Sequence, residues 1–355
     1  MPRARRELAL ALAALLALAG CGGSSDSVAP GAAPVPLLGL VANPTDAHAN
    51  DPDSNLAAID LLKSTGVNLT QSGDLWKTLE SSPGSIDGHT VRFQAQVFAF
   101  LGLAQYYNLR LVDTNQRGVP ADLATMAWDD PAMFARVDAV VDTVLAVAAH
   151  WPFVALSLGN EVDGYFGQSA HQAELPAYRA LLQREVARIH AAHPGMPVAC
   201  CTTSPVRNPA AWVGDTLNRY TDVRSYTYYP FAAASDFQHL PPSTLDADLD
   251  AAVARAATPA FLQEVGYSSS PACGSSTTAQ ADFVRRFRHW HARQSRSRVL
   301  GANYFLFTDW TSATLNLLFT YYGGTSPGFA GYLGGLGLRD SNGVAKPAWE
   351  AWRNP

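Results

Sequence analysis

The chain has 355 residues, of which 48% are hydrophobic and 15% charged, with a formal net charge of −5 at pH 7. This composition supports one large folded domain with a sizeable core and excludes wholesale disorder. The acidic balance gives no indication of a nucleic-acid partner.

The N-terminal stretch is typical of an export signal. A basic start is followed by an apolar run over residues 8–18, which is too short to span a bilayer as a helix. The run closes with Leu18-Ala19-Gly20-Cys21, which resembles the lipobox of bacterial lipoproteins. That resemblance implies cleavage before Cys21 and lipidation of this residue, so residues 1–20 are predicted to be a lipoprotein signal peptide. The alternative is an ordinary signal peptide with an incidental cysteine.

Residues 21–36 are rich in glycine, serine, alanine and proline, and we expect them to form a flexible tether. Several acyl chains on Cys21 would hold the protein stably on a membrane. Gly22 stands where an aspartate would mark retention in the inner membrane, which favours the outer membrane of a bacterial cell envelope. The folded catalytic domain is therefore predicted to be residues 37–355.

Three further cysteines follow, at Cys200, Cys201 and Cys273. An exported protein can form disulfides, and neighbouring cysteines rarely bridge each other. We therefore expect Cys273 to pair with Cys200 or Cys201, and the choice between the two stays open. No cysteine or histidine pair has the spacing of zinc ligands, so neither a metal site nor a cofactor is predicted.

Strand-like and helix-like segments alternate from residue 37 onwards. In the first half, β-favouring segments lie at 37–42, 66–70 and 109–113, and a fourth runs from Phe153 into Gly159-Asn160-Glu161. Helical patterns lie between them, at 56–63, 90–107 and 131–150. Pro131 suits the first turn of the third of these helices.

The second half repeats this scheme. Strands are predicted at 197–203, 223–229, 260–265 and 299–307, and helices at 175–193, 208–219, 245–256, 278–296 and 346–353. Eight strand–helix units in one domain predict a closed (β/α)8 TIM barrel. A doubly wound open sheet is the alternative, and it is disfavoured because residues 42–45 contain no glycine-rich phosphate turn.

Two glutamates stand at the ends of the fourth and seventh predicted strands, Glu161 and Glu264. In a parallel barrel the carboxyl ends of all strands meet at one face, which is where such enzymes keep their chemistry. Two carboxyl groups facing each other there suit cleavage of a glycosidic bond. One protonates the leaving oxygen, and the other attacks the anomeric carbon or activates a water, depending on the gap between them.

Three motifs carry a resemblance to the clan A glycoside hydrolases. Leu158-Gly159-Asn160-Glu161 resembles their Asn-Glu signature, and residues 262–267 (Leu-Gln-Glu-Val-Gly-Tyr) are similar to their nucleophile strand. Residues 223–230 (Val-Arg-Ser-Tyr-Thr-Tyr-Tyr-Pro) resemble their sixth strand, whose end carries a tyrosine. The resemblance covers nearly the whole domain. It implies a TIM barrel acting with retention, with Glu161 as the acid/base and Glu264 as the nucleophile.

The resemblance also implies residues that bind the substrate. Asn160 would hydrogen-bond the 2-hydroxyl of the sugar, and this bond should strengthen in the transition state. Tyr229 would hydrogen-bond Glu264, with Tyr228 as the alternative. Trp310, just past the eighth strand, would form a platform for a sugar ring.

Three more candidates follow from their positions alone. Trp76 is expected in a loop after the second strand, and Asp113 and Asn115 follow the third, so all three are expected at the catalytic face. Many clan A members also carry an arginine and a histidine beside the catalytic pair. This sequence offers no evident match, since Arg110 is expected early in its strand and Tyr226 or Thr227 stands where a histidine is common.

The sequence therefore predicts an exported, lipid-anchored hydrolase that cleaves β-glycosidic bonds of a poly- or oligosaccharide with retention. Long loops expected at 71–89, 163–174 and 231–243 would wall an extended cleft and favour endo-action. Two alternatives remain. The missing arginine and histidine leave room for a non-catalytic, carbohydrate-binding surface lipoprotein on the same barrel. The same two glutamates would also serve a transglycosylase.

Overall fold

The computed structural model describes residues 35–43, 51–151, 153–232, 236–324 and 326–355. The predicted signal peptide, Cys21 and all but the end of the predicted tether lie outside these ranges. Within them, no helix is both long enough and apolar enough to cross a membrane.

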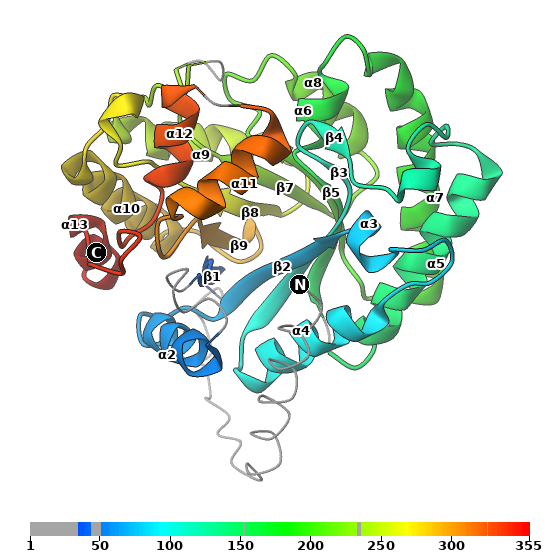
Figure 1. Ribbon diagram of the computed structural model, residues 1–355, viewed down its shortest axis with the longest axis horizontal. Helices are drawn as coiled ribbons and strands as arrows, with labels where there is room; N and C mark the ends of the chain where they lie inside the picture. Colours follow the sequence, from blue (N-terminus) through cyan, green and yellow to red (C-terminus); the bar gives the residue numbers. More distant parts are fainter. Residues whose placement is uncertain (1–34, 44–50, 152, 233–235, 325) are drawn as a thin grey trace.

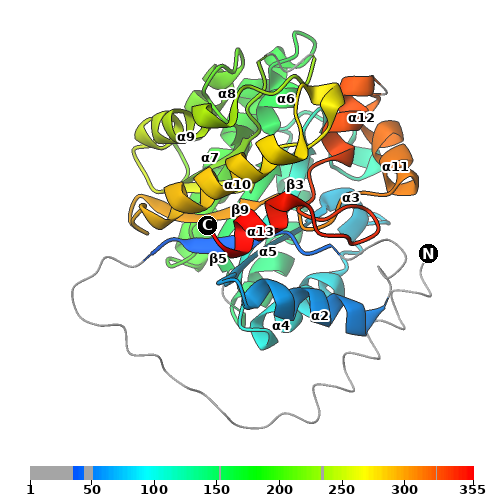
Figure 2. The same ribbon diagram turned by 90° about the vertical axis from the view of Figure 1, so that its left-hand side faces the viewer.

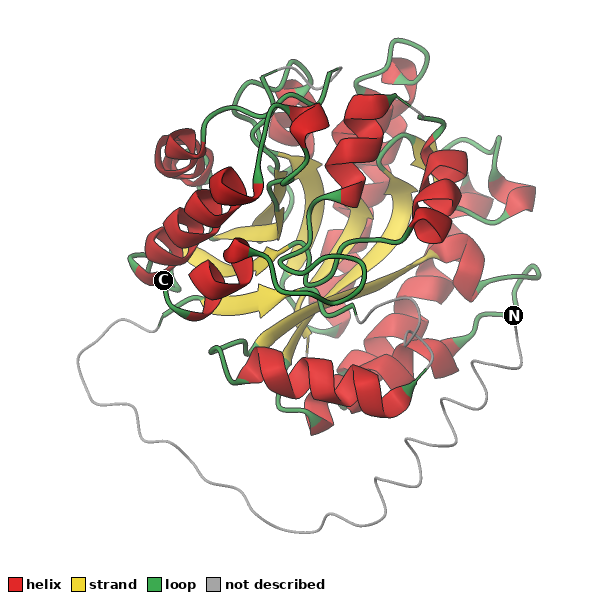
Figure 3. Ribbon diagram, turned by 60° about the vertical axis from the view of Figure 1, so that its left-hand side comes forward, coloured by secondary structure: helices red, strands yellow, loops and turns green. Residues whose placement is uncertain are grey.

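Eight parallel strands close into a barrel that helices surround (Figures 1 and 3), which confirms the predicted TIM barrel. Around the barrel the order is β2-β1-β9-β8-β7-β6-β5-β3, and β2 pairs with β3 to close it. A short strand, β4 (Gln116–Arg117), adds to β3 in the antiparallel direction. The barrel strands are β1 (Leu37–Leu40), β2 (Leu69–Leu75), β3 (Ala104–Asp113), β5 (Phe153–Asn160), β6 (Val198–Thr203), β7 (Val223–Tyr228), β8 (Ala260–Val265) and β9 (Val299–Tyr304).

Helices connect the strands and cover the outside of the barrel. They are α2 (Pro52–Lys63), α4 (Gly88–Phe100), α5 (Pro131–Ala148), α7 (Leu175–Ala192), α8 (Ala211–Leu217), α9 (Leu245–Ala254), α10 (Thr277–Ala292) and α13 (Pro347–Arg353). Four more follow strand ends and so lie at the carboxyl-terminal face of the barrel: α3 (Trp76–Leu79), α6 (Val162–Phe166), α11 (Ser312–Tyr322) and α12 (Pro327–Gly334). Asp130 caps α5 by accepting a hydrogen bond from the Ala132 N–H, next to the proline of the first turn.

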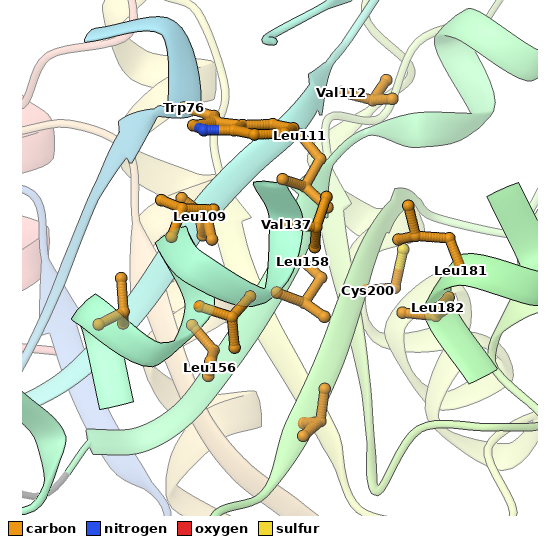
Figure 4. Close-up of a cluster of buried hydrophobic side chains, with 14 of the residues drawn as sticks. Trp76, Leu109, Leu111, Val112, Val137, Leu156, Leu158, Leu181, Leu182 and Cys200 are labelled. Atoms are coloured by element: carbon orange, nitrogen blue, oxygen red, sulfur yellow. The ribbon is translucent and has the colours of Figure 1, made fainter. Parts of the chain in front are cut away.

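The core has an inner and an outer part. A small apolar layer fills the bottom of the barrel, where Tyr106 and Phe261 stack with their ring centroids 4.0 Å apart. Larger clusters fill the space between the strands and the helices. Figure 4 shows part of one of them, with Leu109, Leu156 and Leu158 from the barrel wall and Trp76 at its edge. Along each apolar strand, successive side chains thus point alternately into the barrel and out toward the helices.

Strands β2 and β3 differ from the sequence prediction. Helix α4 ends at Phe100, well before the predicted 107, and Gly102 (φ +69°) turns the chain so that β3 begins at Ala104. The pairing of β2 with β3 then runs from Leu69 to Leu75, through residues that the sequence placed in a loop. As a result, Arg110 lies near the C-terminal end of β3 and not early in its strand.

The predicted disulfide is absent, and this prediction was wrong. Cys200, Cys201 and Cys273 are free and buried. Cys200 lies in the outer core, whereas Cys273 lies at the rim of the barrel, where its thiol hydrogen-bonds the carbonyl oxygen of Gly328 at 3.4 Å. Burial raises the pKa of Cys200 to about 12, so this thiol behaves as a small apolar core residue.

After β9 the chain makes a long excursion, which we call the cap (residues 310–324 and 326–338). It contains α11 and α12, which lie side by side at one end of the barrel (Figures 1 and 2). The excursion leaves and re-enters the barrel at one place, because Thr308 and Arg339 form a parallel bridge. There the Asp309 N–H donates to the Arg339 carbonyl at 2.9 Å, and Lys346 Nζ lies 2.8 Å from Asp309 Oδ2.

Candidate active site

Glu161 directly follows β5 and has an unusual backbone conformation. Its φ of 44° and ψ of 42° are left-handed, which a non-glycine residue adopts at a cost of about 1–2 kcal/mol. The turn is completed by Gly159 (φ 115°), where an added Cβ would lie 2.6 Å from Val162 and 2.8 Å from the Tyr178 hydroxyl. The carboxyl group of Glu161 is therefore presented at the mouth of the barrel by a strained, left-handed backbone turn.

The carboxyl group of Glu161 accepts two hydrogen bonds. The Thr227 hydroxyl donates to Oε1 at 2.6 Å, and the Thr114 hydroxyl donates to Oε2 at 2.9 Å. Burial is the main cause that raises the pKa of Glu161 to about 8, and the nearby charge of Glu264 adds to it, while the two threonine hydroxyls oppose the rise. Glu161 therefore holds a proton at neutral pH and can donate it.

Glu264 on β8 has a different environment. The Tyr229 hydroxyl donates to its Oε2 at 2.6 Å. Burial raises the pKa of Glu264, but the hydrogen bond from Tyr229, the positive charge of Arg110 and a hydrogen bond from Gln71 all lower it. Since Glu264 has these stabilising partners, it is the carboxyl group of the pair that ionises first.

Arg110 is a site residue that the sequence reasoning missed. Burial lowers the pKa of its guanidinium, but the charges of Asp113 and Glu264 raise this pKa by more, so the group stays charged. Its Nε is buried without a hydrogen-bond partner. The alternation of side chains along β3 could have identified Arg110. Tyr106, Asn108 and Arg110 share one side of the strand, and Tyr106 fills the barrel interior, so Arg110 faces the interior as well.

Asn160 is held in one orientation by a chain of hydrogen bonds. Its Nδ2 donates to Asp113 Oδ1 at 2.9 Å, and its Oδ1 accepts from Gln263 Nε2 at 2.6 Å. Gln263 in turn accepts from Asn108 Nδ2 at 2.9 Å, and the Tyr321 hydroxyl donates to the other oxygen of Asp113 at 2.6 Å. These bonds use one of the two amide hydrogens of Asn160, so the second remains for a ligand.

The structure separates the two tyrosine candidates. Tyr229 contacts Glu264, whereas Tyr228 lies in the outer core and donates to Asp248 Oδ2 at 2.9 Å. Trp76 is also outside the site, and its prediction was wrong. It begins α3 and is fully buried in the outer core (Figure 4), where its ring N–H donates to Glu80 at 2.7 Å. The cause is the length of β2, which absorbs the residues expected to form a loop.

The remaining candidates lie near the mouth in different settings. Asp113 is buried and both of its oxygens are hydrogen-bonded by protein groups, so it holds Asn160 in place. Asn115 is exposed, and its Nδ2 donates to the carbonyl of Tyr322 at 3.2 Å, which ties the turn after β3 to the cap. Trp310 is partly exposed at the start of the cap, with its ring 6.3 Å from that of Phe305.

Two tyrosines of the cap belong to the site although no predicted element contained them. Tyr332 packs edge-on against Tyr229 with ring centroids 5.1 Å apart. Burial, and then the charges of Glu161 and Glu264, raise the pKa of Tyr332 well above its ordinary value. Burial also raises the pKa of Tyr322, and the charges of Asp113, Glu161 and Glu264 add to this. Both rings therefore lie within electrostatic reach of the carboxyl pair.

The chemistry of the site follows from these groups. It combines a protonated carboxyl group, an ionisable carboxylate held by a tyrosine and an arginine charge, and an oriented amide. Over the described ranges, no group of three or more His, Cys, Asp or Glu side chains is placed to hold a metal ion. The arrangement suits proton transfer and nucleophilic attack by carboxyl groups.

No family model matches the sequence, and no curated protein matches it. Among solved structures, the chain is similar to GH5_18 from Streptomyces cattleya in complex with GlcNAc, with 18% identity over 91% of this chain and 80% of that chain and a TM-score of 0.67. It is also similar to an exo-β-1,4-mannosidase from Opitutaceae bacterium strain TAV5, with 18% identity over 90% of this chain and 58% of that chain and a TM-score of 0.66. A β-D-glucuronidase from Dictyoglomus thermophilum matches with 16% identity over 90% of this chain and 50% of that chain and a TM-score of 0.58. At these identities the likeness establishes a shared barrel fold.

Proposed function

We propose that the protein is a glycoside hydrolase of the clan A type that cleaves β-glycosidic bonds with retention. The observation that carries the proposal is the unequal setting of two carboxyl groups at one barrel mouth. Glu161 has a pKa raised to about 8, and Glu264 is held by the Tyr229 hydroxyl and the charge of Arg110. Such a division of one proton between two carboxyl groups suits acid-assisted cleavage of a glycosidic bond, and the resemblance of both strand ends to clan A enzymes supports retention.

In the first step Glu264 is the nucleophile. Because Tyr229 occupies Oε2, the other oxygen is available to bond the anomeric carbon as the glycosidic C–O bond breaks. Glu161 gives its proton to the leaving oxygen, so the departing sugar or alcohol leaves neutral. Asn160, fixed by Asp113, would hydrogen-bond the 2-hydroxyl during this step.

In the second step Glu161 becomes the base. Once Glu264 is esterified it carries no charge, so one of the causes that raise the pKa of Glu161 is gone and this pKa falls. Glu161 then takes a proton from water, the water oxygen bonds the anomeric carbon, and the bond to Glu264 breaks. Two inversions give retention of configuration.

The class of sugar is proposed from the neighbours. GH5_18 was solved with GlcNAc and, in a variant, with Manβ1-4GlcNAc, and another neighbour is an exo-β-1,4-mannosidase. These support testing β-mannosides and β-N-acetylglucosaminides first. The sequence favoured endo-action because of three expected loops, but the first, 71–89, is largely made of β2, α3 and the start of α4.

The test of the nucleophile uses Glu264→Ala. This variant should lose hydrolysis of aryl β-glycosides by a factor of about 10⁴ or more, because no covalent intermediate can form. Added azide should partly restore turnover and give a glycosyl azide of inverted configuration, measured by proton NMR. Wild-type activity in this variant would refute the assignment, and product of inverted configuration from the wild type would refute retention.

The test of the acid uses Glu161→Ala with two leaving groups. Hydrolysis of a dinitrophenyl glycoside, which needs little protonation, should fall far less than hydrolysis of a natural disaccharide. An equal loss on both substrates would remove Glu161 from the role of proton donor. Transfer of the sugar to another sugar at high acceptor concentration, in place of hydrolysis, would identify a transglycosylase. Binding of glycans without any turnover would favour the carbohydrate-binding lipoprotein.

We also propose that the protein is exported and anchored to the bacterial cell envelope, with the outer membrane favoured, through lipid on Cys21. The support is the sequence Leu18-Ala19-Gly20-Cys21 after a basic and apolar start. Cells expressing the full chain should incorporate labelled palmitate into the protein and retain it in the membrane fraction. Cys21→Ala should lose both the label and the retention, and an unlabelled wild-type protein would refute the anchor.

A further inference from the structure

We infer that the cap confines this site to the terminal sugar of a chain, so that the protein removes one sugar at a time from the non-reducing end. The inference rests on the proposed function, and it names the part of the substrate that the site accepts.

Helix α11 spans one sector of the barrel mouth. It begins just after β9, and its last residues reach the turn between β3 and β4. There the carbonyl oxygens of Tyr321 and Tyr322 accept hydrogen bonds of 3.2 Å from the side chains of Gln116 and Asn115. In the sheet, β1 and β2 lie between β9 and β3. Lys77, in the helix that follows β2, lies 5.6 Å from the centre of the Tyr321 ring. The helix therefore closes the sector that β1 and β2 line.

The cap is also fixed on the side of β7 and β8. In α12, Tyr332 packs edge-on against Tyr229 and Phe231, at 5.1 and 5.0 Å between ring centroids. The carbonyl oxygen of Gly331 accepts a hydrogen bond of 2.7 Å from the Ser268 hydroxyl. With contacts to the rim after β3, β7 and β8, the cap is a built wall of the site and not a loose loop.

The wall lies on the side of the sugar that stays bound to Glu264. Glu161 protonates the leaving oxygen, so the leaving part of the substrate lies beside Glu161. Asn160 indicates where the sugar ring under attack lies, because we propose that it hydrogen-bonds the 2-hydroxyl of that ring. Asn160 is linked through Asp113 to Tyr321 of the cap. The carbons beyond C2, from which a chain would continue toward its non-reducing end, therefore approach the cap.

Two rings of the cap also lie near the carboxyl pair. Tyr322 and Tyr332 lie near enough to Glu161 and Glu264 for those charges to raise their pKa values. Both side chains are thus placed around the sugar that occupies the site. On this inference they stand where a polymer would have to continue on this side, whereas the leaving part of the substrate extends away from the cap.

The experiment compares simple glycosides with oligosaccharides. A panel of 4-nitrophenyl β-D-glycosides first identifies the accepted sugar, with Glu264→Ala as the blank. Oligomers of three to six units of that sugar, labelled at the reducing end, are then sampled before a tenth is consumed. We expect only the free monosaccharide and the labelled product shortened by one unit. A methyl ether on the terminal hydroxyl that would continue the chain should abolish release.

The outcomes separate the two proposals. Short labelled products from cleavage inside the chain, or cleavage of oligomers without any cleavage of the 4-nitrophenyl glycosides, would overturn the role of the cap and leave the hydrolase intact. Absence of hydrolysis on every glycoside and oligomer would overturn the proposed function itself.

A variant pair tests the wall directly. Tyr322→Ala should widen the side toward the non-reducing end and raise the ratio of released disaccharide to monosaccharide by about tenfold or more. Leu317→Ala is the matched control, because this side chain lies on the same helix but is 67% exposed. Leu317→Ala should leave the ratio and the rate unchanged. An unchanged ratio in a folded Tyr322→Ala protein would remove this residue from the wall.

Discussion

At the scale of single residues, the site depends on which neighbours each carboxyl group has. Glu161 is partly buried and accepts hydrogen bonds only from two threonine hydroxyls, so its pKa is raised and it retains its proton. Glu264 accepts a hydrogen bond from the Tyr229 hydroxyl and lies near the charge of Arg110, so it releases its proton more easily. The two carboxyl groups therefore differ in their affinity for a proton, although both belong to glutamates at strand ends.

The hydrogen bond from Tyr229 has a measurable effect on the pH profile. It lowers the pKa of Glu264, so Tyr229→Phe should raise that pKa and move the acidic limb of kcat/KM to higher pH. The rate at the optimum should fall by about 10-fold to 100-fold, since the carboxylate is no longer held in line. Tyr228→Phe is the control, because it removes a similar bond outside the site. An acidic limb at the same pH in both variants would contradict this role.

At the scale of elements, the strands with apolar runs were predictable and the polar ones were not. Strands β5 and β8 are buried segments with a polar end, and both lie where the sequence placed them. β5 ends at Asn160, directly before Glu161, and β8 contains Glu264. By contrast, Gln71 to Leu75 reads as a loop because its residues are polar, yet it pairs with β3 along its whole length. That pairing, which no local pattern encodes, is what brings Arg110 to the site.

The cap illustrates the same limit. Its helices are rich in leucine, tyrosine and glycine, and none of the residues of α11 is fully buried. A pattern of this kind does not identify what the cap covers, because its partners on the rim include residues 55 to 208 positions away in the sequence. The two glutamates at the barrel mouth could therefore be predicted, but the tyrosines around them could not.

The turn that presents Glu161 should be intolerant of a larger residue. Gly159→Ala combines a positive φ with contacts below 3.0 Å from the new Cβ, so we expect a loss of about 2–4 kcal/mol in the free energy of unfolding. Urea denaturation would measure this loss. Gly195→Ala is the matched control, since nothing lies within 4 Å of its added Cβ, and its effect should stay within about 0.5 kcal/mol. Equal stability of the two variants would show that the turn relaxes.

At the scale of the whole molecule, the active site lowers the stability of the fold. The pKa of Glu161 is about 8 in the folded protein and 4.5 as an isolated group. Between these values the folded protein keeps a proton that the unfolded chain has released, so stability falls as the pH rises through this range. The barrel carries this cost together with the strained backbone of the same residue.

Glu161→Gln should therefore stabilise the protein while abolishing most of its activity. The gain in unfolding free energy should be small near pH 5 and on the order of 4 kcal/mol near pH 8.5, because the glutamine has no charge to bury. Thermal or urea unfolding at the two pH values measures it. Glu350→Gln, at an exposed carboxylate of the last helix, is the control and should show no such dependence on pH. A gain that does not change with pH would refute the raised pKa as the cause.

The parallel bridge between Thr308 and Arg339 means that the cap is a detachable module. Everything between these positions leaves the barrel and returns to the same point, so a short turn could replace it without opening the sheet. Both glutamates, Asn160, Arg110 and Tyr229 precede this point in the chain. The residues proposed for the reaction and the wall proposed to select the chain end are thus encoded in separate stretches. On the proposed role of the cap, a single deletion here would remove the wall that Tyr322 and Tyr332 form, while both glutamates would stay in place.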